Sequence, residues 1–200
     1  DGDYVAPMEC GSIKEAREFI KKYDGVENFS IYGNTNYHYC FISDNFEGTV
    51  PYDLSKIIVA NIDIETGSEN GFPDPQRASE PVTAITVKVK DVFHVFGAGE
   101  YKVHDYNVIY YKCSDELHLL TEFISFWSKQ DIDIITGWNV KFFDIPYLVN
   151  RMTRLFDERF CSGLSPWGFV SERTVNQAGF GGTREQQAFE VMGVATLDYL

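Results

Sequence analysis

The stretch that decides the fold reads IIVANIDIE and spans residues 57–65. Side chains alternate between the two faces of a β-strand. One face of this segment is therefore wholly apolar and consists of Ile58, Ala60, Ile62 and Ile64. The other face begins with apolar side chains, Ile57 and Val59, and ends with Asn61, Asp63 and Glu65. A short apolar run of this kind predicts a buried strand of an α/β domain.

The acidic end of this strand is its unusual feature. Asp63 and Glu65 lie on one face, about 7 Å apart at their Cα atoms. Burying both carboxylates without a partner costs free energy or raises one of their pKa values. A divalent cation between them removes this conflict, and Mg²⁺ fits because it prefers hard oxygen ligands. The ordinary alternative is a strand that leaves the core, with both carboxylates in solvent.

A third carboxylate, Asp144, lies where a helix is expected to begin, just after a short strand and a loop. Asp is a frequent N-cap residue, so a purely structural use of Asp144 is one explanation. A carboxylate at a loop-to-helix junction is also well placed to face the end of a neighbouring strand. Asp144 is therefore a candidate partner of the acidic pair.

Working outward from residues 57–65, the pattern predicts further strands at 82–88, 92–96, 107–111 and 132–136. It predicts helices at 115–129 and 144–151. Ser114 is the candidate N-cap of the first helix, whose apolar stripe consists of Leu117, Leu120, Phe123, Ile124 and Trp127. Strands followed by alternating helix and strand indicate an α/β fold, with a mixed sheet flanked by helices.

The two ends of the chain differ from this central part. Residues 12–24 predict an amphipathic helix, with Ser12 as N-cap, Glu15 in a capping box and Gly25 just past its end. Residues 28–50 are rich in aromatic and turn residues and predict short strands, giving a small N-terminal α+β piece. Residues 179–183 predict a turn and 191–200 a strand, so a long hairpin or an irregular loop precedes Leu200.

Composition restricts the class of protein. The chain has 200 residues, 16% of them aromatic, and a net charge of −13 at pH 7. This acidity argues against a protein that holds DNA by charge alone, but it suits an enzyme that reaches phosphates through divalent cations. No apolar run approaches the ~20 residues of a membrane span, and the first residues have no signal-peptide features. The four widely spaced cysteines indicate thiols in a reducing compartment and not a zinc site.

Two segments resemble the exonuclease motifs of family B DNA polymerases. Residues 63–66, Asp-Ile-Glu-Thr, are similar to the first motif, and residues 137–147, Gly-Trp-Asn-Val-Lys-Phe-Phe-Asp-Ile-Pro-Tyr, to the second. The flanking sequence is similar to the polymerases of T-even-type bacteriophages over nearly the whole chain, notably at residues 59–61, 71–75, 83–86, 165–166 and 197–200. Each motif alone is weak, but the two together are specific.

The resemblance implies a ribonuclease H-like fold. In that arrangement residues 57–200 form an incomplete 3′→5′ exonuclease domain, and residues 1–56 are part of the polymerase N-terminal domain. It further implies that two Mg²⁺ or Mn²⁺ ions are held by Asp63, Glu65 and Asp144. One ion would activate the attacking water, and the other would stabilise the leaving 3′-oxygen.

The resemblance also implies contacts with the single-stranded 3′ end of primer DNA. Phe72 falls where the phage enzymes place an aromatic against the terminal bases, and such stacking is worth roughly 1–3 kcal/mol per base. Asn139 and Phe143 match the second motif and would position the strand or shape the pocket. All three also have an ordinary explanation as loop or core residues. Residues 173–194 resemble the hairpin that helps to move a primer end between the polymerase and exonuclease sites.

Two features of the family have no good match before Leu200. These are the third motif, Tyr-x-x-x-Asp, and the motifs of the polymerase domain. Asp198 lies outside the family's metal-binding motifs and is not a predicted ligand. The simplest explanation is a fragment of a longer polymerase, which alone is expected to bind metal poorly and to cleave slowly or not at all.

The resemblance implies further partners and a location for such a fragment. They are the rest of the polymerase chain, a sliding clamp contacted through a missing region, and the cytoplasm of an infected bacterial host, with no membrane. A stand-alone nuclease of the same fold and a non-catalytic DNA-binding module are the alternatives.

Overall fold

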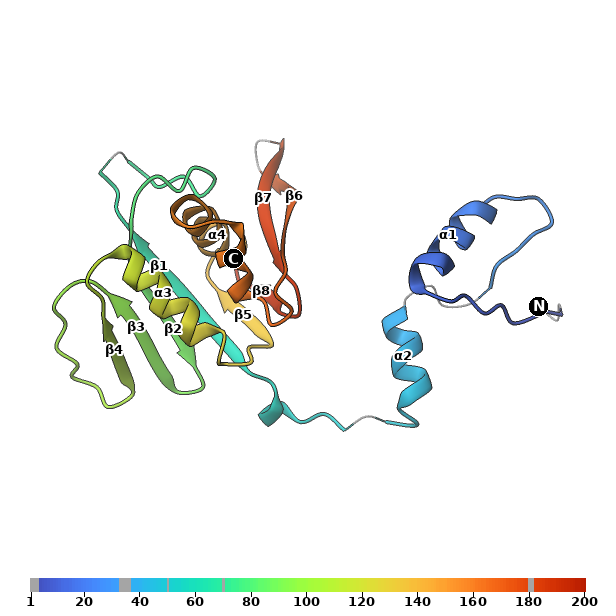
Figure 1. Cartoon of the computed structure of the whole chain (residues 1–200), viewed down its shortest axis with the longest axis horizontal. Helices are drawn as coiled ribbons and strands as arrows, with labels where there is room; N and C mark the ends of the chain where they lie inside the picture. Colours follow the sequence, from blue (N-terminus) through green and yellow to red (C-terminus); the bar gives the residue numbers. More distant parts are fainter. Residues whose placement is uncertain (1–3, 33–36, 50, 70, 180–181) are drawn as a thin grey trace. The chain divides into compact units, whose positions relative to one another are not determined.

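The structure is a computed structural model that describes residues 4–32, 37–49, 51–69, 71–179 and 182–200. The chain divides into two compact units, Asp1–Tyr52 and Asp53–Leu200, and each is described by itself (Figure 1). No helix of the described residues is long and apolar enough to cross a membrane. Cys10 is a free, exposed cysteine, and Cys113 and Cys161 are free and buried.

In the first unit, helix α1 (Ile13–Tyr23) confirms the predicted N-terminal helix. The Ser12 hydroxyl accepts a hydrogen bond from the Glu15 backbone N–H (3.2 Å) and so satisfies one of the unpaired donors of the first turn. Gly25, with φ +73°, follows the last turn in the left-handed conformation that glycine adopts without strain.

The predicted strands of residues 28–50 are wrong where the structure describes this segment. Residues Tyr37–Asn45 form helix α2, so the described part of the N-terminal piece is helical and not α+β. Residues 33–36 and 50 of that prediction lie outside the described residues. Aromatic and β-branched residues favour strands mainly when a neighbouring strand packs beside them. The described part of this unit offers no strand for pairing, whereas a helix satisfies its backbone groups internally.

The second unit is built on a six-stranded sheet with the order β4-β3-β2-β1-β5-β8. Its strands are β1 (Val59–Thr66), β2 (Val82–Val89), β3 (Val92–Gly97), β4 (Val108–Lys112), β5 (Ile134–Gly137) and β8 (Ala195–Asp198). β2 pairs antiparallel with β1 and β3, and the remaining neighbours pair in parallel. Only β2 therefore runs against the others. This confirms the mixed ribonuclease H-like sheet and the four strands predicted after residues 57–65.

Burial along β1 follows the predicted alternation. Ala60, Ile62 and Ile64 are buried in the core, whereas Asp63 and Glu65 on the opposite face are exposed. The core also includes side chains of β2 and β5 and of the two long helices, among them Ile85, Ile135, Phe123, Leu148 and Met152. β1 is therefore covered by core on one face, and its acidic face is open to solvent and ions.

Two long helices pack on this sheet. Helix α3 (Glu116–Trp127) packs against β2 and β3, and α4 (Asp144–Leu155) against β1 (Figure 1). The N-cap of α3 is Asp115, whose carboxylate accepts from the His118 N–H (2.9 Å), and not the predicted Ser114. The predicted stripe is wrong at Leu117, which is 49% exposed, because the buried face includes Leu119 instead.

Short elements complete the unit. They are the 3₁₀ turns η1 (Leu54–Lys56) and η2 (Ser162–Leu164) and helix α5 (Glu158–Cys161). Strands β6 (Val170–Gly179) and β7 (Gly182–Val191) pair antiparallel in a separate two-stranded sheet. The long hairpin, one of two possibilities left open by the sequence, is thus the one observed. Residues 180–181 of the predicted turn lie outside the described residues.

Candidate active site

The acidic pair lies on β1 beyond the point where β5 stops pairing with it. β5 pairs with β1 only from Val59 to Asn61 and ends at Gly137. A Cβ on Gly137 would lie 2.7 Å from the Ile62 carbonyl oxygen. Only glycine therefore fits where the end of β5 approaches β1. The chain therefore leaves the sheet directly beside Asp63, and the loop that leads to α4 begins at the acidic pair.

Asp144 is the first residue of α4, and its side chain is 3% exposed. Its Oδ1 atom accepts a hydrogen bond from the backbone N–H of Ile64 (3.0 Å), the residue between Asp63 and Glu65. The N-cap position belongs to Phe143, which makes no side-chain capping bond. The N-cap explanation of Asp144 is therefore wrong, and its carboxylate instead faces the acidic strand.

Burial raises the pKa of Asp144 to about 7. The hydrogen bond from Ile64 acts in the opposite direction, and the negative charges of Asp63 and Asp198 raise the pKa further. A buried carboxylate beside another carboxylate is stable only with a proton or a cation. Carboxylate oxygens are hard ligands of the kind that Mg²⁺ and Mn²⁺ prefer.

The three carboxylates do not form a closed cage. Among the described residues, no group of three or more His, Cys, Asp or Glu side chains is close enough to hold a metal ion together. Mg²⁺ usually keeps several waters and needs only one or two protein carboxylates in addition to substrate phosphates. The arrangement of Asp144 near Asp63 is compatible with such an open site.

The predicted stacking residue, Phe72, is 88% exposed on the connection between β1 and β2. Its ring centroid lies 5.6 Å from that of Phe143, whose ring in turn lies 5.7 Å from Tyr147 on α4. Phe143 directly precedes Asp144. The structure therefore brings Phe72 and Phe143 together beside the residue that starts α4, with one face of Phe72 open to a ligand.

Polar residues of α4 hold the connection on which Phe72 lies. The Tyr147 hydroxyl donates to the Glu80 carbonyl (2.8 Å), and Asn150 Nδ2 donates to the Pro75 carbonyl (2.8 Å). The Arg151 guanidinium donates to the Ala78 and Ser79 carbonyls (3.1 and 2.9 Å). Sequence reasoning missed these anchors, although polar residues at 147, 150 and 151 share one helix face, a spacing that could have indicated them.

Arg151 is itself fixed by a buried ion pair. Its Nε and one terminal nitrogen donate to the two carboxylate oxygens of Glu116 at 2.8 and 2.7 Å. Glu116 Oε1 also accepts from the Val82 backbone N–H (2.6 Å), at the start of β2. The bidentate pair of Arg151 and Glu116 thus joins α3 and α4 to the end of the β1–β2 connection.

Asn139 lies in the loop between β5 and α4, half-buried, with a left-handed φ of +57°. Its backbone N–H donates to Asp198 Oδ1 (3.0 Å), and the Lys141 N–H donates to Oδ2 (2.9 Å). The sequence excluded Asp198 as a metal ligand but did not indicate this contact. The signal that could have indicated this contact is the position of Asp198 at the end of β8, the strand that follows the hairpin.

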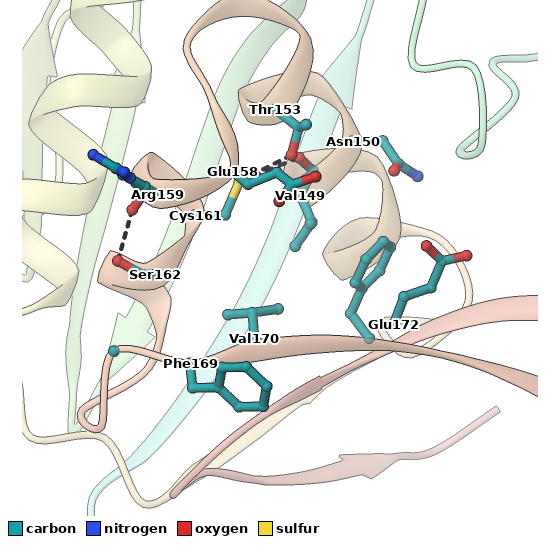
Figure 2. Close-up of a pocket in the computed structure, with 12 residues that line it drawn as sticks. Val149, Asn150, Thr153, Glu158, Arg159, Cys161, Ser162, Phe169, Val170 and Glu172 are labelled. Atoms are coloured by element: carbon teal, nitrogen blue, oxygen red, sulfur yellow. Dashed lines mark hydrogen bonds between the residues drawn. The ribbon is translucent and has the colours of Figure 1, made fainter.

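A cavity of about 480 Å³ lies elsewhere, where α4, α5 and the base of the β6–β7 hairpin meet (Figure 2). Figure 2 shows Thr153 beside Cys161, whose sulfur lies 3.3 Å from the threonine hydroxyl oxygen. None of Asp63, Glu65 and Asp144 lines this cavity. The candidate active site is therefore an open surface at the end of the sheet and not this pocket.

Comparison with known proteins agrees with the resemblance to family B DNA polymerases. Residues 9–200 match the family described as DNA polymerase family B, exonuclease domain. The DNA-directed DNA polymerase of Escherichia phage RB69 is 30% identical over 94% of this chain and 23% of its own length. That of Enterobacteria phage T4 is 30% identical over 100% of this chain and 24% of its own length.

The chain therefore spans about a quarter of the length of these phage relatives (23% and 24%). A solved family B DNA polymerase from Pyrobaculum calidifontis is 29% identical and covers 76% of this chain and 16% of its own, with a TM-score of 0.48. The family match extends over nearly the whole chain. The chain belongs to the 3′→5′ exonuclease domain of the family B DNA polymerases.

Proposed function

We propose that this chain is the proofreading region of a DNA-directed DNA polymerase and that it hydrolyses the 3′-terminal phosphodiester of DNA with two divalent metal ions. One observation carries the proposal. The buried carboxylate of Asp144 is held by the backbone N–H between Asp63 and Glu65, so residues of both matching motifs meet at one point. Core packing alone does not explain why a carboxylate lies in a place where burial raises its pKa to about 7.

The three carboxylates differ in exposure, and their proposed roles differ accordingly. Asp63 and Glu65 face solvent and can present carboxylate oxygens to Mg²⁺ or Mn²⁺ without loss of core packing. Asp144 contributes a buried oxygen whose direction is set by its bond to Ile64. When bound, the ions supply an activated water and stabilise the leaving 3′-oxygen. On this proposal, the terminal phosphate lies over the carboxyl end of β1, where Asp63 and Glu65 are located.

Substrate placement is assigned to the aromatic residues beside this point. Phe72 is exposed and lies against Phe143, so its free face can stack on a base of any identity, as proofreading requires. The Asn139 side chain extends from a loop whose backbone is held by Asp198 and is the proposed polar contact to the strand. A negatively charged chain needs such contacts, because its net charge repels DNA.

Domain assignment and partners belong to the same proposal. Residues 1–56 are assigned to the polymerase N-terminal domain and 57–200 to the exonuclease domain. The proposed partners are the single-stranded 3′ end of primer DNA, the remainder of a polymerase chain and a sliding clamp, in the cytoplasm of an infected bacterial host. Similarity to two phage polymerases supports this setting.

Asp63→Ala is the direct test of the metal site. In the intact protein, with any sequence that follows Leu200, excision of a 5′-labelled single-stranded oligonucleotide should require Mg²⁺ or Mn²⁺. The substitution should lower the excision rate by at least about 100-fold and leave the circular dichroism spectrum unchanged, since Asp63 is exposed. Asp105→Ala removes an exposed carboxylate from the β3–β4 connection and should retain full activity. Equal activity in Asp63→Ala, or cleavage in excess chelator, would refute the two-metal assignment.

The alternatives are a stand-alone nuclease and a non-catalytic binding module. The reading frame beyond Leu200 distinguishes the first of these from the proposal. A Tyr-x-x-x-Asp motif followed by polymerase motifs supports the polymerase, and a stop codon there supports the stand-alone nuclease. Metal-independent binding of DNA without cleavage by the intact protein would support the binding module.

A further inference from the structure

Asp198 ends strand β8, which lies at the edge of the sheet beside β5 (Figure 1). Its carboxylate accepts three backbone hydrogen bonds. Oδ1 accepts from the Asn139 and Leu200 N–H groups (3.0 and 2.9 Å), and Oδ2 accepts from the Lys141 N–H (2.9 Å). Both oxygens are therefore engaged with the backbone, which leaves Asp198 poorly suited to bind a metal ion.

Two of these donors, the Asn139 and Lys141 N–H groups, belong to the loop that joins β5 to α4. β5 is the neighbour of the acidic strand β1 in the sheet. The loop begins at Gly137, which packs against the Ile62 carbonyl, and ends at Asp144. Inside it, the Asn139 carbonyl accepts from the Phe142 and Phe143 N–H groups (3.1 and 2.8 Å). Asn139 thus gives its N–H to Asp198 and its carbonyl to the turn that starts α4.

The conformation of this loop needs an external anchor. Asn139 has a φ of +57°, in the left-handed region that is strained for a non-glycine residue. Hydrogen bonds to an ionised carboxylate are stronger than those to neutral acceptors, so Asp198 can offset this strain. The next residue, Tyr199, accepts from Asn61 Nδ2 (3.1 Å), which ties the end of β8 to β1, two residues before Asp63.

We propose that Asp198 is a positioning residue of the exonuclease site. It clamps the backbone of Asn139 and Lys141, and so fixes the Asn139 side chain and the start of α4 against the acidic end of β1. Asp144 then faces the Ile64 N–H. This inference rests on the proposed function, and it assigns to Asp198 a role through the loop and not through metal or substrate.

The test compares Asp198→Ala with Asp198→Asn. In the full chain, Asp198→Ala should accelerate amide hydrogen exchange at Asn139 and Lys141 by about tenfold or more, because both lose a charged acceptor. Asp198→Asn keeps one acceptor oxygen and should protect one of the two amides. In the intact protein, excision should rank unaltered protein first, Asp198→Asn second and Asp198→Ala last, which is partial rescue by the conservative variant.

Asp133 provides a matched control. Its carboxylate also accepts a backbone N–H, that of Ile58 (2.8 Å), but at the beginning of β1. Asp133→Ala should leave exchange at Asn139 and Lys141 unchanged. Thermal denaturation of every variant shows whether the fold persists, and Asp198→Asn keeps the comparison valid if Asp198→Ala does not fold.

Two results would overturn the positioning role. One is unchanged exchange at both amides in folded Asp198→Ala. The other is an equal loss of Mn²⁺ binding, measured by electron paramagnetic resonance, in Asp198→Asn and Asp198→Ala, which would make Asp198 a ligand. Absence of excision and of Mn²⁺ binding in the unaltered protein would instead count against the proposed function. The two failures are thus distinguishable.

Discussion

The carboxylate of Asp144 accepts a hydrogen bond from the backbone N–H of Ile64 at 3.0 Å, across 80 residues of sequence. Ile64 lies between Asp63 and Glu65, so this bond joins the segments that carry the two sequence motifs. It also holds a carboxylate inside the protein, where burial raises its pKa to about 7. Stability, metal binding and excision should therefore all respond to changes at this point.

The pKa of Asp144 predicts a pH dependence of stability in the absence of metal. The folded chain keeps a proton on Asp144 up to about pH 7, whereas the unfolded chain loses it near the ordinary aspartate pKa of 3.8. The stabilising contribution of this proton is thus fully present below pH 3.8 and is lost as the pH rises to about 7. Asp144→Asn should remove this slope and should be more stable than the unaltered chain above pH 7.

Melting temperatures of the metal-free chain between pH 4.5 and 8 provide the measurement. The difference between Asp144→Asn and the unaltered chain should grow across this range and level off above pH 7. Asp105→Asn, at an exposed carboxylate, should follow the unaltered chain. A pH-independent difference for Asp144→Asn would show that this carboxyl is ionised throughout the range.

Phe72→Ala should weaken substrate binding without changing stability, because the side chain is 88% exposed. Loss of one stacked base contact, worth roughly 1–3 kcal/mol, corresponds to a rise in KM for single-stranded DNA of about 5- to 150-fold. Phe72→Trp should retain binding. Steady-state excision kinetics give KM, and Tyr106→Ala, at another fully exposed aromatic, is the control. The same KM in Phe72→Ala and Tyr106→Ala would remove Phe72 from the binding surface.

Arg151→Met should lower the free energy of unfolding by about 3–5 kcal/mol, because it leaves the Glu116 carboxylate buried without its partner. The side chains of this pair are only 10% and 16% exposed. Arg77→Ala, which removes an ion pair with Asp74 at 83% and 48% exposure, should cost less than about 1 kcal/mol. Urea denaturation measures both. Equal losses in the two variants would mean that the buried pair contributes no more than a surface pair.

Gly137→Ala should destabilise the chain by about 1–3 kcal/mol, since its Cβ would lie 2.7 Å from the Ile62 carbonyl oxygen. The same substitution should lower excision, because it pushes the end of β5 away from the acidic strand. Gly99→Ala is the matched control, as no atom lies within 4 Å of its added Cβ. Urea denaturation and excision rates would be compared for both, and a neutral Gly137→Ala would show that the two strands separate without cost.

Much of the second unit could be predicted from local patterns. The alternation in residues 57–65 correctly placed Ile62 and Ile64 in the core and the two acids on the open face. The strands at 82–88 and 92–96 are observed within one residue at each end. These features follow from side-chain periodicity, which is a property of neighbouring residues.

Predictions went wrong where the partner of a segment decided its structure. Residues 37–45 carry strand-forming side chains yet form α2, in a unit whose described residues contain no strand to pair with. Leu117 fits a helical stripe but is exposed, because α3 turns Leu119 toward the core. Propensity and periodicity rank conformations of a segment, but packing against other segments selects among them.

The sequence by itself determined the family, the mixed α/β sheet and the candidate acids Asp63, Glu65 and Asp144. Only the tertiary structure decided that Asp144 bonds to Ile64, that Phe72 lies against Phe143, and that Asp198 holds the Asn139 loop. The physical reason is that a carboxylate or an aromatic ring accepts many partners equally well. Which partner it meets depends on strand order and on where each loop leaves the sheet, and these are set by the packing of residues far apart in sequence.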